Sequence, residues 1–323
     1  MSFAVVTADD ERCLAAWEAW PEREVHAHPE YVRLYEEEAT RALCAVAGGV
    51  LYPFLLRKDP VDVVTPYGYG GAFRTGEADA DAFWRAFDAW AAEQGAVSEL
   101  VRFSLFPERL LPYPGEREPR LVNVVRDLEP PADELWMDYD HKVRKNVNKA
   151  RRSGLRVEID ETGARLDDFV GLYEHTLDRR GASSRYRFPR AFFERIRGGL
   201  AGHFAFAHVL DGERVVSSEL ALLSATSAYS FLGGTDEAAF ELRPNDLLKV
   251  ELMLWAKEAG RRRFVLGGGQ QADDGIFRYK RSFAPHGLVP FEVGMRVLRP
   301  DVYEELTRRA GAPREPGFFP AYR

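Results

Sequence analysis

The chain carries one pattern of helix-forming residues twice, about 165 positions apart. The first copy is formed by Asp81, Phe83, Phe87, Trp90, Ala91, Glu93 and Gly95. The second copy keeps the spacing, with leucines in place of the two phenylalanines: Asp246, Leu248, Leu252, Trp255, Ala256, Glu258 and Gly260. Two unrelated amphipathic helices could share a few Trp and Gly positions by chance, so the pattern needs support from its surroundings.

The surroundings of the helix repeat as well. Each copy follows strand-like segments that end in a glycine pair, Gly70-Gly71 and Gly233-Gly234, and each precedes another strand. Further upstream, an apolar run at 43–56 breaks at Gly48-Gly49, and a second run at 204–223 breaks at Asp211-Gly212. Both breaks are hairpin signals. The order hairpin, strand, Gly-Gly, helix, strand therefore occurs twice, which predicts a duplicated α/β domain.

The length of 323 residues suits two domains, and the hydrophobic content of 46% supports a core in each. Glu129-Pro130-Pro131 predicts a break, so we expect one domain at 1–130 and another at 131–323. The remaining signals in the second half predict helices at 133–153, 167–180, 189–200 and 301–310, and strands at 155–159, 263–266, 277–283 and 287–298.

Several classes of protein are disfavoured by the composition. Cys13 and Cys44 offer neither a disulfide framework nor metal-ligand spacing, and residues 1–10 lack the features of a signal peptide. The longest apolar run, 43–56, contains a glycine turn and is too short to span a bilayer. We therefore expect a cytoplasmic protein without a metal site or membrane insertion; the sequence leaves the oligomeric state open.

Basic residues are concentrated in one segment of a chain whose net charge is −7. Residues 141–156 contain seven Lys or Arg and no acid. On a helix, four of these cations fall within an arc of roughly 80°, away from the apolar residues of the same segment. The four are Lys142, Lys145, Lys149 and Arg152. Such a stripe attracts phosphates in a salt-dependent way. The alternative is a solvated helix face.

A second candidate is the glycine-rich stretch Gly267-Gly268-Gly269 with the nearby basic residues Arg278, Lys280 and Arg281. Successive glycines let backbone amides approach a ligand, and a lysine can stabilise negative charge. The spacing matches neither the dinucleotide fingerprint nor the P-loop. A glycine-rich turn with a purely structural role is the alternative.

Five segments together resemble the Fem-type ligases. They are 143–150 (VRKNVNKA) with Gly154, 246–260 (from DLL to Gly260), 266–268 (LGG), 277–283 (FRYKRSF) and 62–71 (DVVTPYGYGG). The resemblance covers nearly the whole chain. It implies an α/β fold of two tandem acetyltransferase-like (GNAT) domains, each a mixed, mostly antiparallel sheet flanked by helices, which also accounts for the duplication.

The resemblance further implies acyl transfer that forms an amide bond. The donor would be aminoacyl-tRNA, and the acceptor an amine of a peptide, a cell-wall precursor or a natural product, with no permanently bound cofactor. Lys280 matches the family position associated with binding the donor end and stabilising developing charge. Gly268, Gly269, Arg278 and Arg281 surround it in the sequence. The long coiled-coil arm of some cell-wall ligases has no counterpart here, so a cell-wall acceptor is less secure.

The catalytic motifs that the sequence lacks are those of enzymes with a covalent intermediate or a metal, which favours direct aminolysis. The chain has no Gly-x-Ser-x-Gly elbow, no convincingly activated cysteine and no helical His pair. An aminoacyl ester is already activated, so the protein must orient two substrates and stabilise an oxyanion. The carboxylates that could accept the proton of the amine are Asp62, Glu219 and Asp236, each of which lies beside a strand or a glycine turn. Ordinary surface acids occupy similar places in a sequence. Tyr67, Tyr69 and Gly70 are predicted to bind the acceptor, unless they only pack a turn.

Two other functions remain open. An acyl-CoA-dependent N-acetyltransferase using acetyl-CoA would share the fold, but the expected glycine-containing pyrophosphate loop is replaced by 241–246, which has no glycine. Backbone amides at a helix start can bind phosphate in other sequences. A non-catalytic RNA-binding protein would use the basic helix alone. Because the basic segment and Lys280 belong to the second copy, we expect that copy to hold the donor and the first to shape the acceptor side.

Overall fold

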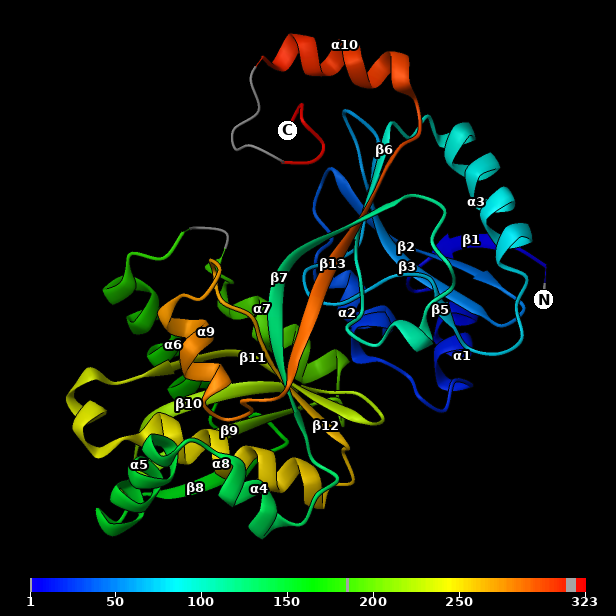
Figure 1. Ribbon diagram of the computed structural model, residues 1–323. Coiled ribbons are helices and arrows are strands. Elements are labelled where there is room, and N and C mark those ends of the chain that lie inside the picture. Colours follow the sequence, from blue (N-terminus) through cyan, green and yellow to red (C-terminus); the bar gives the residue numbers. More distant parts are fainter. Residues whose placement is uncertain (1, 184–185, 312–317) are drawn as a thin grey trace. The chain divides into compact units, whose positions relative to one another are not determined.

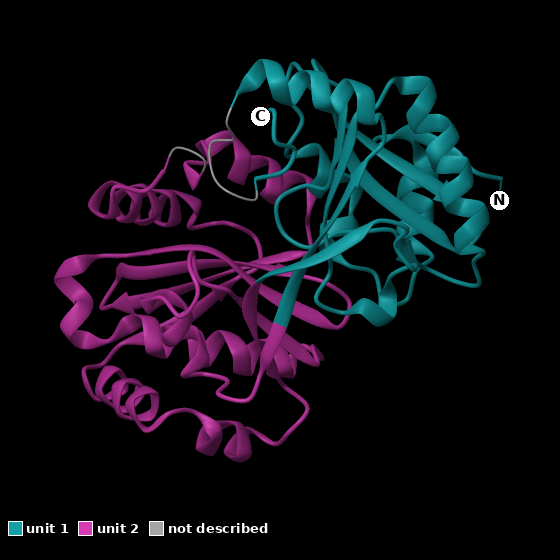
Figure 2. Cartoon of the chain, turned by 45° about the horizontal axis from the view of Figure 1, so that its top comes forward, with its two compact units in different colours: residues 1–120, 290–323 teal, residues 121–289 magenta. Residues whose placement is uncertain are grey.

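The computed structural model describes residues 2–183, 186–311 and 318–323. The chain divides into two compact units, shown in Figure 2: unit 1 is formed by residues 1–120 and 290–323, and unit 2 by residues 121–289. These units differ from the expected domains, because the last segment of the chain belongs to unit 1 and the start of unit 2 precedes the proline pair at 130–131.

Unit 1 is a mixed sheet with helices. Its helices are α1 (Glu11–Glu18), α2 (Pro29–Arg33), α3 (Ala80–Gln94) and α10 (Pro300–Ala310). Its strands are β1 (Ala4–Thr7), β2 (Thr40–Ala47), β3 (Val50–Arg57), β4 (Asp62–Val64), β5 (Phe73–Arg74), β6 (Ser98–Arg102) and most of β13 (Leu288–Val297). The sheet order is β1-β2-β3-β4-β6-β13, with β5 beside β3. Strands β4 and β6 run parallel, and the other paired strands in this order run antiparallel.

Unit 2 has the same kind of sheet. Its helices are α4 (Ala132–Asp138), α5 (His141–Arg152), α6 (Leu166–Arg180), α7 (Arg190–Gly199), α8 (Pro244–Glu258) and α9 (Gly275–Arg281). Its strands are β8 (Arg156–Asp160), β9 (Phe204–Asp211), β10 (Arg214–Leu223), β11 (Ser227–Thr235), β12 (Arg263–Gly267) and the second half of β7 (Glu116–Asp127). The order is β8-β9-β10-β11-β12-β7, and here β11 and β12 are the parallel neighbours.

The two units correspond strand by strand, as the duplicated sequence pattern predicts. Each has a hairpin, then a third antiparallel strand, a helix of 15 residues and a strand that returns parallel to the third. Gly95 and Gly260 follow the two helices with φ of 71° and 81°. This left-handed conformation costs glycine little and explains why the pattern ends on glycine in both copies.

The sixth strand of each sheet comes from the other copy of the sequence. β7 follows β6 along the chain, yet its second half pairs with β12. β13 follows β12, yet it pairs with β6. The duplicated copies have therefore exchanged their final strands, and this exchange is the reason that the expected boundary at 130–131 does not separate the units.

Each unit has its own core. In unit 1 the rings of Tyr52, Phe54 and Phe87 are fully buried and pack against one another on the sheet. In unit 2 the buried cluster includes Leu252 and Phe264. Burying one such side chain stabilises a fold by about 1.5–3 kcal/mol. Both units thus contain enough apolar side chains to hold a sheet and its helices together.

Two expected elements differ in the structure. The segment 277–283, expected as a strand, is helix α9, because Asp274 accepts a hydrogen bond from the backbone N–H of Phe277 at 2.7 Å and caps a helix. The expected helix at 133–153 is interrupted at Tyr139 and Asp140, giving α4 and α5. The other expected elements of the second half are present within a few residues of their predicted bounds. Across the described residues, no helix is both long and apolar enough to span a membrane.

Candidate active site

The parallel strands of unit 2 separate in the middle of the sheet. β11 and β12 pair at Ala228 with Phe264 and at Tyr229 with Val265, and the pairing goes no further. A β-bulge follows in β11, because the adjacent residues Ala221 and Leu220 of β10 pair with Ser230 and Leu232, which are two positions apart. Bulges disrupt the ladder locally and are frequent next to active sites. The separated ends of β11 and β12 form the frame of the candidate site.

The equivalent strands of unit 1 do not separate in this way. Beyond β4, the N–H of Thr65 bonds to the carbonyl of Leu100 at 3.1 Å, and the N–H of Gly70 bonds to the carbonyl of Arg102 at 2.7 Å. The N–H of Arg102 in turn bonds to Oγ1 of Thr65 at 2.8 Å. The segment 65–70 therefore fills in unit 1 the place that is left open in unit 2.

Lys280 is the predicted site residue that the structure places at these strand ends. It lies on α9, and its Nζ donates a hydrogen bond to the carbonyl oxygen of Gly268, just past β12, at 2.7 Å. Burial, with a smaller effect of the ammonium of Lys249, lowers the pKa of Lys280 to about 8. A lysine with this pKa can carry a proton at neutral pH or release one. The helical form of α9 leaves Arg278 and Arg281 exposed, and both form ion pairs with Asp273.

A buried ion pair lies in the same part of unit 2. Nζ of Lys249 is 2.6 Å from Oε1 of Glu219 and 2.9 Å from Oγ of Ser230, the residue before the bulge. The side chains of Lys249 and Glu219 are 7% and 12% exposed. Glu219 was a predicted catalytic residue, whereas Lys249 was missed. Lys249 lies in the buried stripe of α8 with Leu252, Met253 and Ala256. A lysine among the apolar residues of a helix is unusual, and this pattern is the signal in the sequence by which Lys249 could have been predicted.

Two more polar groups complete this cluster. Asp246, 8% exposed at the start of α8, accepts a hydrogen bond from Nδ2 of Asn146 at 3.2 Å, and burial raises its pKa. Within the described residues the buried hydroxyl of Tyr279 has no hydrogen-bond partner. Burial, together with the charges of Asp246 and Glu219, raises the pKa of Tyr279. The hydroxyl is thus a neutral donor available to a ligand. All three residues lie in segments that resemble the Fem-type ligases, but none was predicted as a site residue.

The glycine-rich turn is organised around Asp274. This carboxylate accepts hydrogen bonds from the N–H of Gln270 at 2.6 Å and of Gln271 at 3.0 Å. A Cβ on Gly269 would lie 2.4 Å from Oδ1 of Asp274. The turn therefore needs glycine for close packing, and its amides after Gly269 are occupied. Gly268 directs its carbonyl oxygen toward Lys280, whereas the sequence predicted a backbone amide that binds phosphate.

The basic helix α5 docks as its apolar residues predict. Val143, Val147 and Ala150 are buried, and α5 contacts α8, beside which it lies in Figure 1. Lys142, Lys145 and Arg152 are exposed, and among the described residues they form no ion pair. Nζ of Lys149 lies 3.7 Å from Oε2 of Glu241, with both side chains in solvent. A hollow of about 350 Å³ on this surface is lined by Trp136, His141, Arg144, Lys145, Asn148 and Arg152.

The other predicted carboxylates have structural partners. Asp236 caps a short helical turn by accepting from the N–H of Ala238 at 3.0 Å, and it also pairs with Arg214. Asp62, buried in unit 1, accepts hydrogen bonds at 2.7 Å from Oγ of Ser98 and from Nε of Arg323. Of the three predicted carboxylates, Glu219 is the one that lies in the cluster with Lys249 and Lys280.

The predicted acceptor residues lie in unit 1. Tyr67 is 45% exposed, and its carbonyl oxygen accepts a hydrogen bond from the hydroxyl of Tyr31 at 2.6 Å. The ring of Tyr69 packs edge-on against His26. A Cβ on Gly70 would lie 3.0 Å from Cγ2 of Thr65, so this glycine allows a close approach of the backbone. The turn is packed, and it exposes one aromatic ring.

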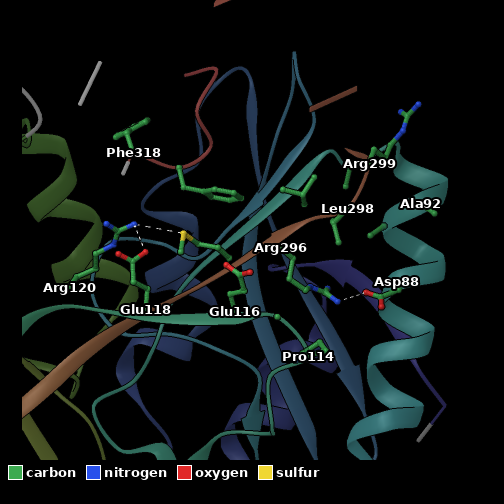
Figure 3. Close-up of a pocket in the computed structure, with 16 residues that line it drawn as sticks. Asp88, Ala92, Pro114, Glu116, Glu118, Arg120, Arg296, Leu298, Arg299 and Phe318 are labelled. Carbon is green, nitrogen blue, oxygen red and sulfur yellow. Dashed lines mark hydrogen bonds and ion pairs between the residues drawn. The ribbon is translucent and has the colours of Figure 1, made fainter. Parts of the chain in front are cut away.

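A larger cavity, of about 900 Å³, lies in unit 1 along α3, the start of β7 and the end of β13 (Figure 3). Arg296 in its wall forms ion pairs with Asp88 at 2.8 Å and with Glu99 at 2.6 Å, so its charge is compensated. None of the predicted site residues lines this cavity. In the ranges that the structure describes, His, Cys, Asp and Glu form no group that could hold a metal ion.

Comparisons with known proteins agree with this architecture. The pattern of a family described as "Acetyltransferase (GNAT) domain" matches residues 137–281. A curated relative, the UDP-N-acetylmuramoylpentapeptide-lysine N(6)-alanyltransferase of Weissella viridescens, is 26% identical over 199 residues, which cover 59% of this chain and 57% of the relative. The chain thus matches little more than half the length of that relative.

Two solved structures share the fold. The crystal structure of FemX has a TM-score of 0.71 at 13% identity, with 94% of this chain and 99% of that chain covered. A tandem GNAT protein from the clavulanic acid biosynthesis pathway has a TM-score of 0.52 at 10% identity, with 93% and 99% covered. The resemblance to the Fem-type acyltransferases of the GNAT superfamily is thereby confirmed, and the fold is that of two tandem GNAT-like units.

Proposed function

We propose that this protein is an acyltransferase that forms an amide bond by transferring an aminoacyl group from aminoacyl-tRNA to an amine. The observation that carries the proposal is Lys280, an ammonium with a pKa near 8 held at the separated ends of two parallel strands. The alanyltransferase relative and the FemX fold favour an aminoacyl donor. The acceptor is an amine of a peptide, a cell-wall precursor or a natural product.

The reaction needs no nucleophile from the enzyme. The lone pair of the neutral acceptor amine attacks the carbonyl carbon of the aminoacyl ester, and the carbonyl π electrons move onto oxygen. The ammonium of Lys280 stabilises this oxyanion, because a fixed charge in a water-poor site costs no reorganisation during the reaction. The intermediate then collapses, the bond to the ribose oxygen breaks, and the amide is formed.

The proton of the attacking amine must leave as the amide forms. Its final acceptor is the ribose oxygen of the tRNA, which becomes a hydroxyl again, so the reaction is balanced without another reactant. Glu219 can relay this proton, since its carboxylate lies in the cluster with Lys249 and Lys280. In that arrangement Lys249 is a positioning residue that holds Glu219 in one orientation.

The basic helix α5 is assigned to the donor side. Lys142, Lys145, Lys149 and Arg152 offer cations to the phosphates of the tRNA acceptor stem, and the hollow beside Lys145 gives room for one phosphate. On the acceptor side, the exposed ring of Tyr67 is available for contact with a substrate in unit 1. Localisation in the cytoplasm, where charged tRNA is found, belongs to the same proposal.

The alternative is an acyl-CoA-dependent N-acetyltransferase, which the description of the GNAT family favours. The two functions differ in the donor. The full-length protein is incubated with aminoacyl-tRNA or with acetyl-CoA and a panel of amines, and the amine-dependent loss of the acyl group is measured. Loss from aminoacyl-tRNA alone supports the proposal. Loss from acetyl-CoA alone would establish the alternative, and tRNA binding without turnover would indicate an RNA-binding protein.

The Lys280→Met variant tests the role of the ammonium. We expect kcat to fall by about 10²–10³-fold, as for loss of one oxyanion donor in other enzymes, with the binding of tRNA retained. Lys58→Met, which removes an exposed lysine of a turn in unit 1, is the matched control and is expected to keep full activity. Unchanged turnover in Lys280→Met would contradict the assigned role.

A further inference from the structure

Arg102 of unit 1 is a partly buried cation without an acidic partner. It ends β6, and its Nη1 donates a hydrogen bond to the carbonyl oxygen of Thr65 at 2.9 Å. Within the described residues it forms no ion pair, although 51 acidic residues give the chain a net negative charge. Burial lowers its pKa, and the nearby Arg57 lowers it further. A charge that is partly removed from water and has no ion pair costs free energy, and binding of an anion would recover part of that cost.

The sheet register places both arginines on one face. Arg57 pairs with Asp62 and Leu55 with Val64 across β3 and β4, while Val64 pairs with Leu100 across β4 and β6. Because side chains alternate along a strand, one side of the sheet carries Arg57, Leu55, Asp62, Val64, Leu100 and Arg102. The apolar members join the buried cluster under α2. The two arginines therefore flank this buried cluster, and the carboxylates of Asp62 and Glu37 act on Arg57 but, within the described residues, are not among the groups that act on Arg102.

Tyrosine side chains line the same place. Besides Arg57, the titratable groups near Arg102 are the phenols of Tyr67, Tyr35 and Tyr31. The hydroxyls of Tyr31 and Tyr35 lie 3.2 Å apart, and Tyr31 also donates to the carbonyl of Tyr67. The ring of Tyr67 is 45% exposed, so this side remains open to a ligand. Neutral phenols satisfy hydrogen bonds of an anion without compensating the charge of Arg102.

We propose that Arg102, supported by Arg57 and the tyrosines at 31, 35 and 67, binds an oxyanion group of the acceptor substrate. The group is a carboxylate or a phosphate, since the planar guanidinium fork matches both. The site lies beside segment 65–70, because Nη1 of Arg102 bonds to the carbonyl oxygen of Thr65 and Tyr67 belongs to the same segment. This inference rests on the proposed function only in naming the ligand as the acceptor.

The test uses direct binding to the full-length protein in low salt, measured by calorimetry. Inorganic pyrophosphate tests for binding of a phosphate. The dipeptide alanyl-alanine tests for binding of a carboxylate, and its carboxamide is the neutral control. We expect one of the two oxyanions to bind, and Arg102→Met to weaken that binding by at least ~10-fold, with Arg102→Lys in between. Arg41→Met, which removes an exposed arginine of β2, is expected to leave it unchanged.

The folding of the variants gives a second reading. Since Arg102→Met removes a partly buried charge that has no ion pair, we expect its thermal midpoint to stay or rise. The bound anion should raise the midpoint of the wild-type protein but not of the variant. If neither oxyanion binds the wild type, or if Arg102→Met and Arg102→Lys bind as well as the wild type, the inference is wrong. Acyl transfer and its loss in Lys280→Met would be unaffected by that result, so the two proposals fail separately.

Discussion

The ammonium of Lys249 lies 2.6 Å from Oε1 of Glu219 inside the core of unit 2. Lys249 extends from the buried stripe of α8, and Glu219 belongs to β10, so the pair joins helix and sheet. Oγ of Ser230 in β11 accepts another hydrogen bond from the same ammonium at 2.9 Å. One lysine thereby ties together three elements around the place where β11 and β12 separate.

Removing one member of this pair should destabilise the protein strongly. We expect Lys249→Met to lower the free energy of unfolding by about 3–5 kcal/mol, because Glu219 is left buried without its partner. Replacing both, as Lys249→Met with Glu219→Leu, should recover much of this loss. Urea unfolding monitored by tryptophan fluorescence measures both effects. The exposed pair Arg151–Glu251 provides the control: breaking it should cost less than about 1 kcal/mol.

The lowered pKa of Lys280 predicts a pH dependence of activity. If its ammonium stabilises the oxyanion, kcat should fall as the pH rises through about 8. Lys280→Arg keeps the charge to much higher pH, so this descending limb should move upward by at least one pH unit even if the maximal rate is lower. The pH dependence of kcat, measured for both proteins at saturating substrate concentrations, tests this prediction. An unshifted limb in Lys280→Arg would assign it to another group.

The same pKa predicts how stability varies with pH. The folded pKa, about 8, lies below the unfolded value near ~10.4, so the unfolded chain binds more protons between these pH values. The burial of Lys280 therefore costs stability in full below pH 8, and this cost disappears as the pH rises toward 10. In Lys280→Met, the free energy of unfolding should therefore rise less between pH 8 and pH 10 than in the wild-type protein. Equal slopes for the two proteins would contradict it.

The cap of α9 should control the position of Lys280. Asp274→Ala removes the carboxylate that accepts from the N–H groups of Gln270, Gln271 and Phe277, and caps of this kind contribute about 1 kcal/mol. We expect a loss of stability of that size together with a drop in kcat, because α9 carries the ammonium. Asp274→Asn, which retains one acceptor oxygen, should preserve most of both. Full activity in Asp274→Ala would separate the cap from catalysis.

The exposed cations of α5 should determine the salt dependence of tRNA binding. Each phosphate contact that is lost reduces the slope of log K against log salt by about 0.7–0.9. We expect Lys145→Ala with Arg152→Ala to weaken binding and to reduce the slope by about 1.5. Filter binding at several salt concentrations measures it, with Arg308→Ala on the exposed face of α10 as the control. An unaltered slope would remove α5 from the donor site.

The fold could be predicted largely because its signals are local. The helix pattern, the hairpin glycines and the docking face of α5 depend on neighbours in the sequence, and each is found in the structure. The segment 277–283 was misjudged because its aromatic residues favour strands, while the deciding group, Asp274, caps the helix from outside the segment. In this segment the helix cap decides the structure against the strand propensity of the aromatic residues.

The site could be predicted only in part, because its members meet through tertiary contacts. Lys280 was predicted by resemblance, and Glu219 by its place beside a strand. Lys249 is indicated in sequence only by a charge in an apolar stripe. Nothing near Asp62 or Asp236 in the sequence shows that their oxygens are occupied by Arg323 and Arg214, more than twenty positions away in each case.

The exchange of β7 and β13 gives the duplicated gene a property that simple tandem copies lack. A fragment that ends near residue 130 would leave the edge of β6 without β13, and the complementary fragment would leave the edge of β12 without β7. Unpaired strand edges invite aggregation. Neither half of the sequence encodes a complete sheet, so we expect the two copies to be inheritable as working domains only when both are present in one chain.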